Sequence, residues 1–196
     1  MKALLLLFAS YLLGSIPTGL LLARGIAGVD PRERGSGNIG ATNVLRTTGK
    51  ALAVLTLLGD MAKGFLPVML ARAWGGPLWV VAGCGLASFL GHLFPIYLRF
   101  RGGKGVATAM GVYLALSPLA LLPAAALFVL AVALSRMVSV GSLLGAGGMP
   151  AFLALFGYPP QLIILSGVIG ALIFLKHKDN IRRIIRGEER KLGERL

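Results

Sequence analysis

Long apolar stretches alternate with short basic or glycine-rich stretches along the whole chain, and this pattern predicts a polytopic membrane protein. A helix needs about 20 mostly apolar residues to cross a bilayer. We therefore expect an all-α helix bundle of about seven transmembrane helices. The fourth and seventh candidate spans are short for a full crossing; the seven are 3–23, 51–73, 78–98, 106–116, 119–134, 138–156 and 161–175.

The positions of lysine and arginine predict how the spans are oriented. Cytoplasmic loops carry an excess of these residues, and most of the 20 here lie in 24–50, 99–105 and the tail from 176. With seven spans, this places the N-terminus outside and the C-terminus in the cytoplasm. The chain starts with a single lysine and an apolar run through Leu22, which favours an uncleaved first span over a signal peptide.

Composition agrees with a membrane protein. Hydrophobic residues make up 56% of the chain, and the mean hydropathy is +0.82, which exceeds the usual range for soluble domains. The net charge of +13 would suggest nucleic-acid binding in a soluble domain. Here the charges flank apolar spans, so we expect no nucleic-acid partner. The single cysteine, Cys84, lies inside a span and leaves no disulfide framework within the chain.

The stretch 34–46, RGSGNIGATNVLR, has the composition of an anion-binding loop. Its glycines alternate with small hydroxyl and amide residues, and none of its side chains is acidic. Successive free N–H groups in such a turn form a concave anion site. A helix that starts near Ala41 would add its own N–H groups and the positive end of its dipole. The stretch therefore suits phosphate or carboxylate at a membrane surface.

Arg101-Gly-Gly-Lys-Gly105 is a second candidate phosphate loop, with Lys104 just before a helical pattern. A basic loop that merely caps a span explains it equally well. His92, at the end of the third span, could act as a base. A structural role is favoured, because no acidic residue is close to it in the sequence.

Three further groups of polar residues lie in or beside the spans. His177 and Asn180 share one face of a continuing helix, as ligands or as part of a basic membrane anchor. Ser139 and Ser142 could line a pocket or cap a helix. Asp60 and Lys63 lie within the second span, where pairing with each other is favoured over a function. No cluster has the spacing of metal ligands, so we expect no metal site.

Three motifs identify the sequence as similar to a known family. GSGNIGATN, HLFPIYLRFRGGKGVAT and KHKDNIRR, in this order among apolar spans, resemble the bacterial acyl-phosphate:glycerol-3-phosphate acyltransferase family (PlsY). The resemblance covers essentially the whole chain. It implies a single integral-membrane acyltransferase domain over 1–196, located in the inner membrane of bacteria with its active site facing the cytoplasm.

The resemblance also implies a reaction and its partners. A fatty acyl group passes from acyl phosphate to the sn-1 hydroxyl of glycerol 3-phosphate, giving lysophosphatidic acid and phosphate for phospholipid biosynthesis. No metal or organic cofactor is required. The donor is expected from a soluble acyltransferase, PlsX, that produces acyl phosphate.

The resemblance and the loop chemistry together give a set of expected site residues. The catalytic residues are expected to be Asn43, Lys104 and His177, with Asn43 orienting the glycerol. The phosphate of glycerol 3-phosphate is expected on cations, amides and a hydroxyl: Arg46, Lys104, Ser142, His177 and Asn180. The acyl phosphate is expected on the glycine-rich loops: Ser36, Gly37, Asn38, Gly40, Gly102 and Gly103.

The identity of the base and the class of protein leave alternatives open. His177 could accept the proton of the attacking hydroxyl, but a substrate phosphate oxygen is favoured, because His177 has no obvious orienting acid in the sequence. A transporter or flippase for a small organic anion is the main alternative to an enzyme. A structural membrane subunit whose basic loops bind anionic lipid is a third class.

Overall fold

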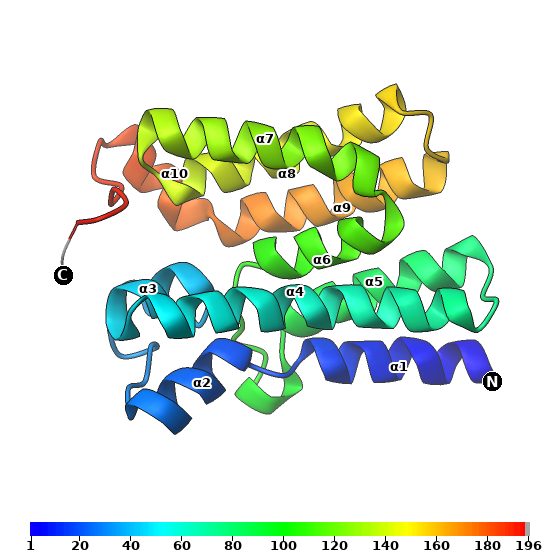
Figure 1. The fold of residues 1–196 in the computed structure, drawn as a ribbon, viewed down its shortest axis with the longest axis horizontal. Coiled ribbons are helices and arrows are strands. Elements are labelled where there is room, and N and C mark those ends of the chain that lie inside the picture. Colours follow the sequence, from blue (N-terminus) through cyan, green and yellow to red (C-terminus); the bar gives the residue numbers. More distant parts are fainter. Residues whose placement is uncertain (195–196) are drawn as a thin grey trace. The chain divides into compact units, whose positions relative to one another are not determined.

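The computed structural model describes residues 1–194, and every regular element among these residues is helical (Figure 1). The all-α prediction is therefore confirmed. The elements are α1 (Lys2–Gly14), α2 (Thr18–Ala27), α3 (Ala41–Thr48), α4 (Lys50–Ala73), α5 (Leu78–Leu93), the 3-10 helix η1 (Ile96–Leu98), α6 (Val106–Leu116), α7 (Pro118–Ser135), α8 (Val138–Leu155), α9 (Pro160–Lys176) and α10 (Lys178–Ile185).

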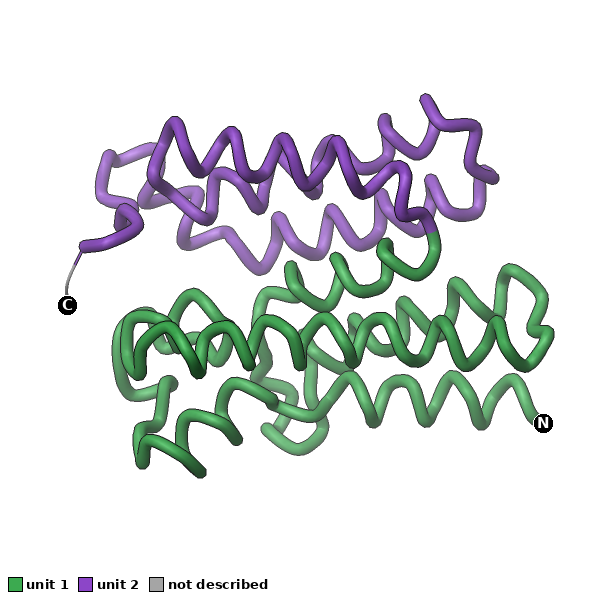
Figure 2. The backbone as a smooth tube through the Cα atoms, viewed as in Figure 1, with its two compact units in different colours: residues 1–116, 196 green, residues 117–195 purple. Residues whose placement is uncertain are grey.

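The chain forms two compact units, coloured separately in Figure 2. Unit 1 comprises residues 1–116, with α1 to α6, and unit 2 begins at Ser117, with α7 to α10. Within unit 1, α4 packs against α2, α3, α5 and α6, while α1 lies along α5. Within unit 2, α8 packs against both α7 and α9.

Among residues 1–194, five segments are long and apolar enough to cross a membrane. The bent pair α9 and α10 makes a sixth if the two helices count as one span, and α6 is a shorter apolar helix. The helices are thus compatible with an integral-membrane fold. The count of seven spans and the orientation of the termini stay predictions. The candidate spans are Lys2–Ala27, Lys50–Ala73, Leu78–Leu98, Pro118–Ser135 and Val138–Leu155.

The apolar run of the first candidate span suggested one continuous helix, but the structure divides it into two. Helix α1 ends at Gly14 and α2 begins at Thr18. Pro17 has no N–H to donate and its ring disfavours helical geometry in the residue before it, so the helix breaks there. The break leaves the carbonyl of Ile16 outside a regular helix, where other groups can bond to it.

Glycines allow α4 and α6 to approach closely in unit 1. A Cβ on Gly64 of α4 would lie 2.2 Å from the carbonyl oxygen of Thr108, and one on Gly111 of α6 would lie 1.9 Å from that of Met61. Small residues at such crossings are typical of membrane helices, where association depends on close packing and not on burial from water. This contact fixes α6, which follows the loop that carries Lys104.

Candidate active site

Asn43 organises the first glycine-rich loop, between α2 and α3. Its side chain is buried and its amide donates hydrogen bonds to the carbonyl oxygens of Pro31 (2.7 Å), Asn38 (2.8 Å) and Arg34 (3.1 Å). Its Oδ1 accepts a hydrogen bond from the N–H of Ser36 (2.8 Å). The prediction that Asn43 orients the glycerol stays a prediction, and the structure gives its amide a second task, which is to shape the loop.

The N–H groups of this loop are engaged within the protein at three of the expected positions. Besides that of Ser36, the N–H of Gly37 donates to the carbonyl oxygen of Arg34 (3.1 Å) and that of Gly40 donates to Oδ1 of Asn38 (2.8 Å). The open row of N–H groups that we expected is therefore absent at these positions. The cause is that two asparagine amides fold the loop back on itself.

An ion pair holds the start of the same loop. Arg32 donates to Asp30 through Nε (3.0 Å to Oδ1) and through Nη2 (2.6 Å to Oδ2). These hydrogen bonds lower the pKa of Asp30 to about 2, so its carboxylate stays ionised near neutral pH. Arg46 lies in the last turn of α3 and is partly buried, close to a helix end that favours cations.

The second glycine-rich loop rests on the C-terminal turn of α5. The N–H of Gly103 donates to the carbonyl oxygen of His92 (3.1 Å), and a Cβ on Gly102 would lie 2.1 Å from the same oxygen. A Cβ on Gly103 would lie 2.2 Å from Nε2 of His92. Only glycine allows so close an approach. The loop that carries Lys104 therefore takes its position from α5.

A buried group of charged and polar side chains lies on the other side of His92. Nζ of Lys63 lies 2.8 Å from Oδ1 of Asp60, and Nδ1 of His92 lies 3.6 Å from the same oxygen. Lys63 also donates to the carbonyl oxygen of Ile16 (2.8 Å), at the break between α1 and α2. The predicted pairing of Asp60 with Lys63 is confirmed. The acidic neighbour of His92 was missed, because it belongs to another helix.

Ser142, His177 and Asn180 all lie in unit 2 and are buried. Ser142 donates to the carbonyl oxygen of Val138 (2.9 Å), and α8 has no side-chain cap, so the capping interpretation of the two serines is wrong. His177 ends α9 and precedes α10, and the two helices meet at 62°. The continuing helix assumed for His177 and Asn180 is therefore broken at His177.

His177 is oriented by the backbone of its own helix. Its Nδ1 lies 2.8 Å from the carbonyl oxygen of Ile173. A carbonyl oxygen only accepts hydrogen bonds, so Nδ1 is the protonated nitrogen in this assignment and Nε2 is left to face other groups. In this tautomer a neutral imidazole can accept a proton at Nε2, and a charged one can donate there.

Glu189, in unit 2, contacts an expected site residue, although no motif indicated a role for it. Its carboxylate accepts hydrogen bonds from Ser139 (2.7 Å), Asn180 (2.5 Å) and Arg183 (2.8 Å). Burial alone would raise the pKa of Glu189, but these three donors lower it below its ordinary value. Glu189 therefore holds Asn180 in place and ties the tail to α8. Nothing in the sequence distinguished Glu189 from the other acidic residues of the tail, which are Asp179, Glu188 and Glu194.

The structure groups the expected site residues within each unit. In unit 1, one loop and the helix after it carry Ser36, Gly37, Asn38, Gly40, Asn43 and Arg46, and a second loop carries Gly102, Gly103 and Lys104. Unit 2 carries Ser142, His177 and Asn180. Among residues 1–194, no group of three or more His, Cys, Asp or Glu side chains could hold a metal ion.

These features define a helical membrane protein whose basic, glycine-rich loops suit phosphorylated ligands. The sequence model of one family, described as glycerol-3-phosphate acyltransferase, matches residues 4–187. Because the match extends over most of the chain, the protein belongs to the glycerol-3-phosphate acyltransferase family.

Curated relatives agree with this assignment. The chain is 51% identical to the glycerol-3-phosphate acyltransferase of Geobacter sulfurreducens, over 96% of this chain and 97% of the relative. It is 46% identical to that of Rubrobacter xylanophilus, over 100% and 98% of the two chains.

Solved structures are similar over almost the same extent. A crystal structure of PlsY (YgiH), an integral membrane glycerol 3-phosphate acyltransferase, in its glycerol 3-phosphate form is 43% identical, with a TM-score of 0.94 over 98% of this chain and 96% of that one. Its lysophosphatidic acid form is 42% identical, with a TM-score of 0.92 over the same shares.

Proposed function

We propose that the protein transfers a fatty acyl group from acyl phosphate to the sn-1 hydroxyl of glycerol 3-phosphate, giving lysophosphatidic acid and phosphate. The main support is the family relationship, together with similarity to PlsY structures in glycerol 3-phosphate and lysophosphatidic acid forms. The loops fit this reaction chemically, because both reactants carry phosphate and the loops offer cations, amides and hydroxyl groups.

The reaction needs no covalent intermediate on the enzyme. The hydroxyl oxygen of glycerol 3-phosphate attacks the acyl carbonyl carbon and forms the new ester bond. The bond between that carbon and the phosphate oxygen breaks, and phosphate leaves with the bonding electron pair. The hydroxyl proton passes to a substrate phosphate oxygen, with Nε2 of His177 as the alternative acceptor. Holding two reactants in the right geometry supplies much of the acceleration of such a transfer.

The proposal assigns a set of residues to each reactant. The phosphate of glycerol 3-phosphate is assigned to cationic and polar side chains: Arg46, Lys104, Ser142, His177 and Asn180. The acyl phosphate is assigned to the two glycine-rich loops: Ser36, Gly37, Asn38, Gly40, Gly102 and Gly103. Since several loop N–H groups bond internally, side chains and the remaining N–H groups carry this binding. Preorganised donors of this kind stabilise the developing oxyanion.

The family relationship supports a location in the bacterial inner membrane, and the charge distribution supports the orientation. We assign the protein to this membrane, with its N-terminus outside and with its basic loops, active site and C-terminus on the cytoplasmic side. The whole chain acts as one acyltransferase domain, with seven spans if α6 and the α9–α10 pair each count as one. A soluble acyltransferase of the PlsX type supplies acyl phosphate, and no cofactor takes part.

A purified-protein assay tests the proposal. The protein in detergent or liposomes is given labelled glycerol 3-phosphate with palmitoyl phosphate or with palmitoyl-CoA. We expect labelled lysophosphatidic acid only with palmitoyl phosphate, and none from Lys104→Ala. Lys50→Ala, which removes an exposed lysine outside the two loops, is the matched control and should keep its activity. Uptake of glycerol 3-phosphate into liposomes without any product would overturn the proposal in favour of a transporter.

A further inference from the structure

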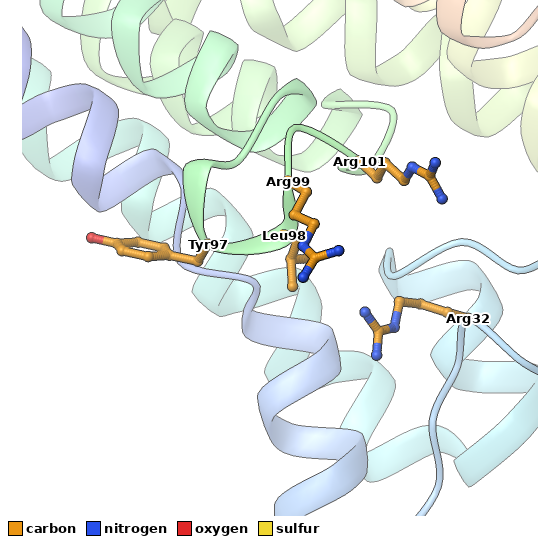
Figure 3. Close-up of a pocket in the computed structure, with 5 residues that line it drawn as sticks. All are labelled: Arg32, Tyr97, Leu98, Arg99 and Arg101. Atoms are coloured by element: carbon orange, nitrogen blue, oxygen red, sulfur yellow. The ribbon is translucent and has the colours of Figure 1, made fainter.

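Three arginines line a pocket in unit 1. None of the expected site residues belongs to the lining of this pocket. Its lining is Arg32, Tyr97, Leu98, Arg99 and Arg101, and its volume is about 430 Å³. The guanidinium groups of Arg32 and Arg99 lie on opposite sides of the opening, with Arg101 at the edge of the same turn, and the ring of Tyr97 points away (Figure 3). The pocket therefore gathers positive charge from two segments distant in the sequence.

The backbone of the turn after α5 is held in a sparsely populated conformation. Arg99 (φ 50°) and Phe100 (φ 63°) are consecutive non-glycine residues in the left-handed region, which is unfavourable for residues with a Cβ. The N–H of Phe100 donates to the carbonyl oxygen of Pro95 (2.9 Å), and the hydroxyl of Tyr11 in α1 donates to that of Phe94 (2.7 Å). These bonds hold the turn in the conformation that presents Arg99 and Arg101.

The positive charge of the pocket is only partly compensated. Asp30 pairs with Arg32, and a second arginine, Arg24, lies 3.9 Å from the same carboxylate. Among the residues that the structure describes, no acidic side chain forms an ion pair with Arg99 or Arg101. Two guanidinium groups are thus available to an anionic ligand, and their planar forks match the oxygens of a phosphate group.

The pocket lies at the end of a membrane-spanning segment. The candidate span Leu78–Leu98 ends inside the pocket lining. Beside the arginines, Ile96, Tyr97 and Phe100 are 46%, 56% and 59% exposed. Exposed aromatic residues next to arginines are typical of the membrane–water interface, where lipid headgroups lie. A water-soluble anion would need no such apolar surround.

We propose that this pocket binds the phosphate headgroup of an anionic membrane phospholipid, at a place separate from the two reactants. The phosphodiester bonds to Arg99 and Arg101, with Arg32 fixed by Asp30 on the opposite side. The acyl chains extend along the apolar surface of Ile96 and Phe100. Bound lipid would hold the turn that leads directly into the Gly102–Gly103 loop.

Titration calorimetry on the purified protein in neutral detergent tests the proposal. Three probes are compared. Dihexanoyl phosphatidylglycerol is an anionic phospholipid, dihexanoyl phosphatidylcholine is a zwitterionic one, and inorganic phosphate is an anion without acyl chains. We expect the first to bind the wild type most tightly. Its affinity should fall about thirtyfold in Arg99→Gln/Arg101→Gln, if each arginine contributes as basic residues near anionic lipid surfaces do. Arg99→Lys/Arg101→Lys should lose part of the affinity, because lysine keeps the charge without the fork.

Two controls separate this site from the transfer reaction. Lys50→Gln removes one exposed positive charge from unit 1 outside the pocket and should bind the lipid as the wild type does. Saturating glycerol 3-phosphate should leave the lipid affinity unchanged, whereas competition would show that the pocket belongs to the transfer site and would overturn the proposal. Equal lipid affinity in the double glutamine variant, or inorganic phosphate binding as tightly as the lipid, would also overturn it.

Discussion

The imidazole of His92 and the backbone of Gly103 are in such close contact that neither residue can change independently. A Cβ added to Gly103 would lie 2.2 Å from Nε2 of His92. The three atoms nearest to this added Cβ all belong to the imidazole ring. On its other side, Nδ1 of the same ring is 3.6 Å from Oδ1 of Asp60. The buried charges of α4 and the loop that carries Lys104 are therefore linked through one ring.

Replacing Gly103 with alanine should reduce transfer, and a smaller residue at 92 should partly restore it. In Gly103→Ala the new methyl group displaces the loop from α5, because His92 cannot move without disturbing Asp60. We expect at least a tenfold fall in kcat/KM, about 1.4 kcal/mol. His92→Asn/Gly103→Ala should recover part of this loss, since the shorter side chain vacates the space. Steady-state kinetics of both single variants and the double variant measure the coupling.

A control variant separates the positioning of the Gly103 loop from a general loss of packing in unit 1. Ser10→Ala removes a buried hydroxyl in unit 1 that donates to the carbonyl oxygen of Leu6 within α1 (2.6 Å), and it should leave both KM and kcat unchanged. An absence of any recovery in the double variant would contradict the ring-to-loop link.

Neutralising Asp60 alone should destabilise the protein more than removing both members of its pair. Asp60→Asn leaves Lys63 buried at 5% exposure without its carboxylate, and breaking a buried ion pair typically costs about 3–5 kcal/mol. Asp60→Asn/Lys63→Met removes both charges, so its cost should be smaller. Thermal unfolding in detergent measures this order. A double variant that melts below the single one would show that Lys63 acts chiefly through the carbonyl of Ile16.

Elements marked by local signals could be predicted from the sequence. Helix α3 begins at Ala41 and the chain breaks between α6 and α7 at Ser117, both as expected, because glycine and proline act on their immediate neighbours. The break at Pro17 was missed, because the apolar run continues on both sides of this proline and is long enough to span a membrane. Hydropathy reports burial in lipid and not helix continuity.

Contacts between distant segments could not be predicted in this way. Nothing near His92 in the sequence points to Asp60, and nothing near Asn180 points to Glu189. Asn43 was predicted to be a site residue from its motif, whereas its bonds to the loop depend on a fold that brings the carbonyl oxygen of Pro31 within 2.7 Å of its amide. Motifs predict which residues belong to a site, whereas packing decides what each one contacts.

Removing the amide of Asn43 should abolish transfer while leaving the protein folded. Asn43→Ala loses the four hydrogen bonds of its amide that hold the loop, each contributing about 1 kcal/mol, but none of these bonds joins the spans. We expect at least a hundredfold loss of kcat/KM with an unchanged helical circular dichroism spectrum. Thr48→Val, which removes a hydroxyl bonded within the same helix, should remain active. Wild-type kinetics in Asn43→Ala would contradict this role for the loop.

The contribution of Glu189 to stability should depend on pH with a defined sign. Its folded-state pKa lies below the ordinary value of 4.5, so its stabilising effect is full above pH 4.5 and is lost as pH falls through the lower folded-state pKa. The thermal midpoint of the wild type should therefore exceed that of Glu189→Gln at pH 7, and the difference should shrink below pH 4.5. Glu188→Gln, at the exposed neighbouring position, should show no such trend.

His177→Gln should retain substantial turnover if a substrate phosphate accepts the proton. Glutamine can place an amide near the position of Nε2, where it supplies a neutral donor to phosphate in place of a charged imidazolium, but it cannot act as a base. We then expect KM for glycerol 3-phosphate to rise about tenfold or more, as for loss of a charged hydrogen bond, with little change in kcat. If Nε2 of His177 is the base, kcat should instead fall by about 10²–10⁴ with KM unchanged. His177→Asn, whose amide can replace Nδ1 at the carbonyl of Ile173, controls for the bend between α9 and α10, because it keeps that contact and loses the group at Nε2.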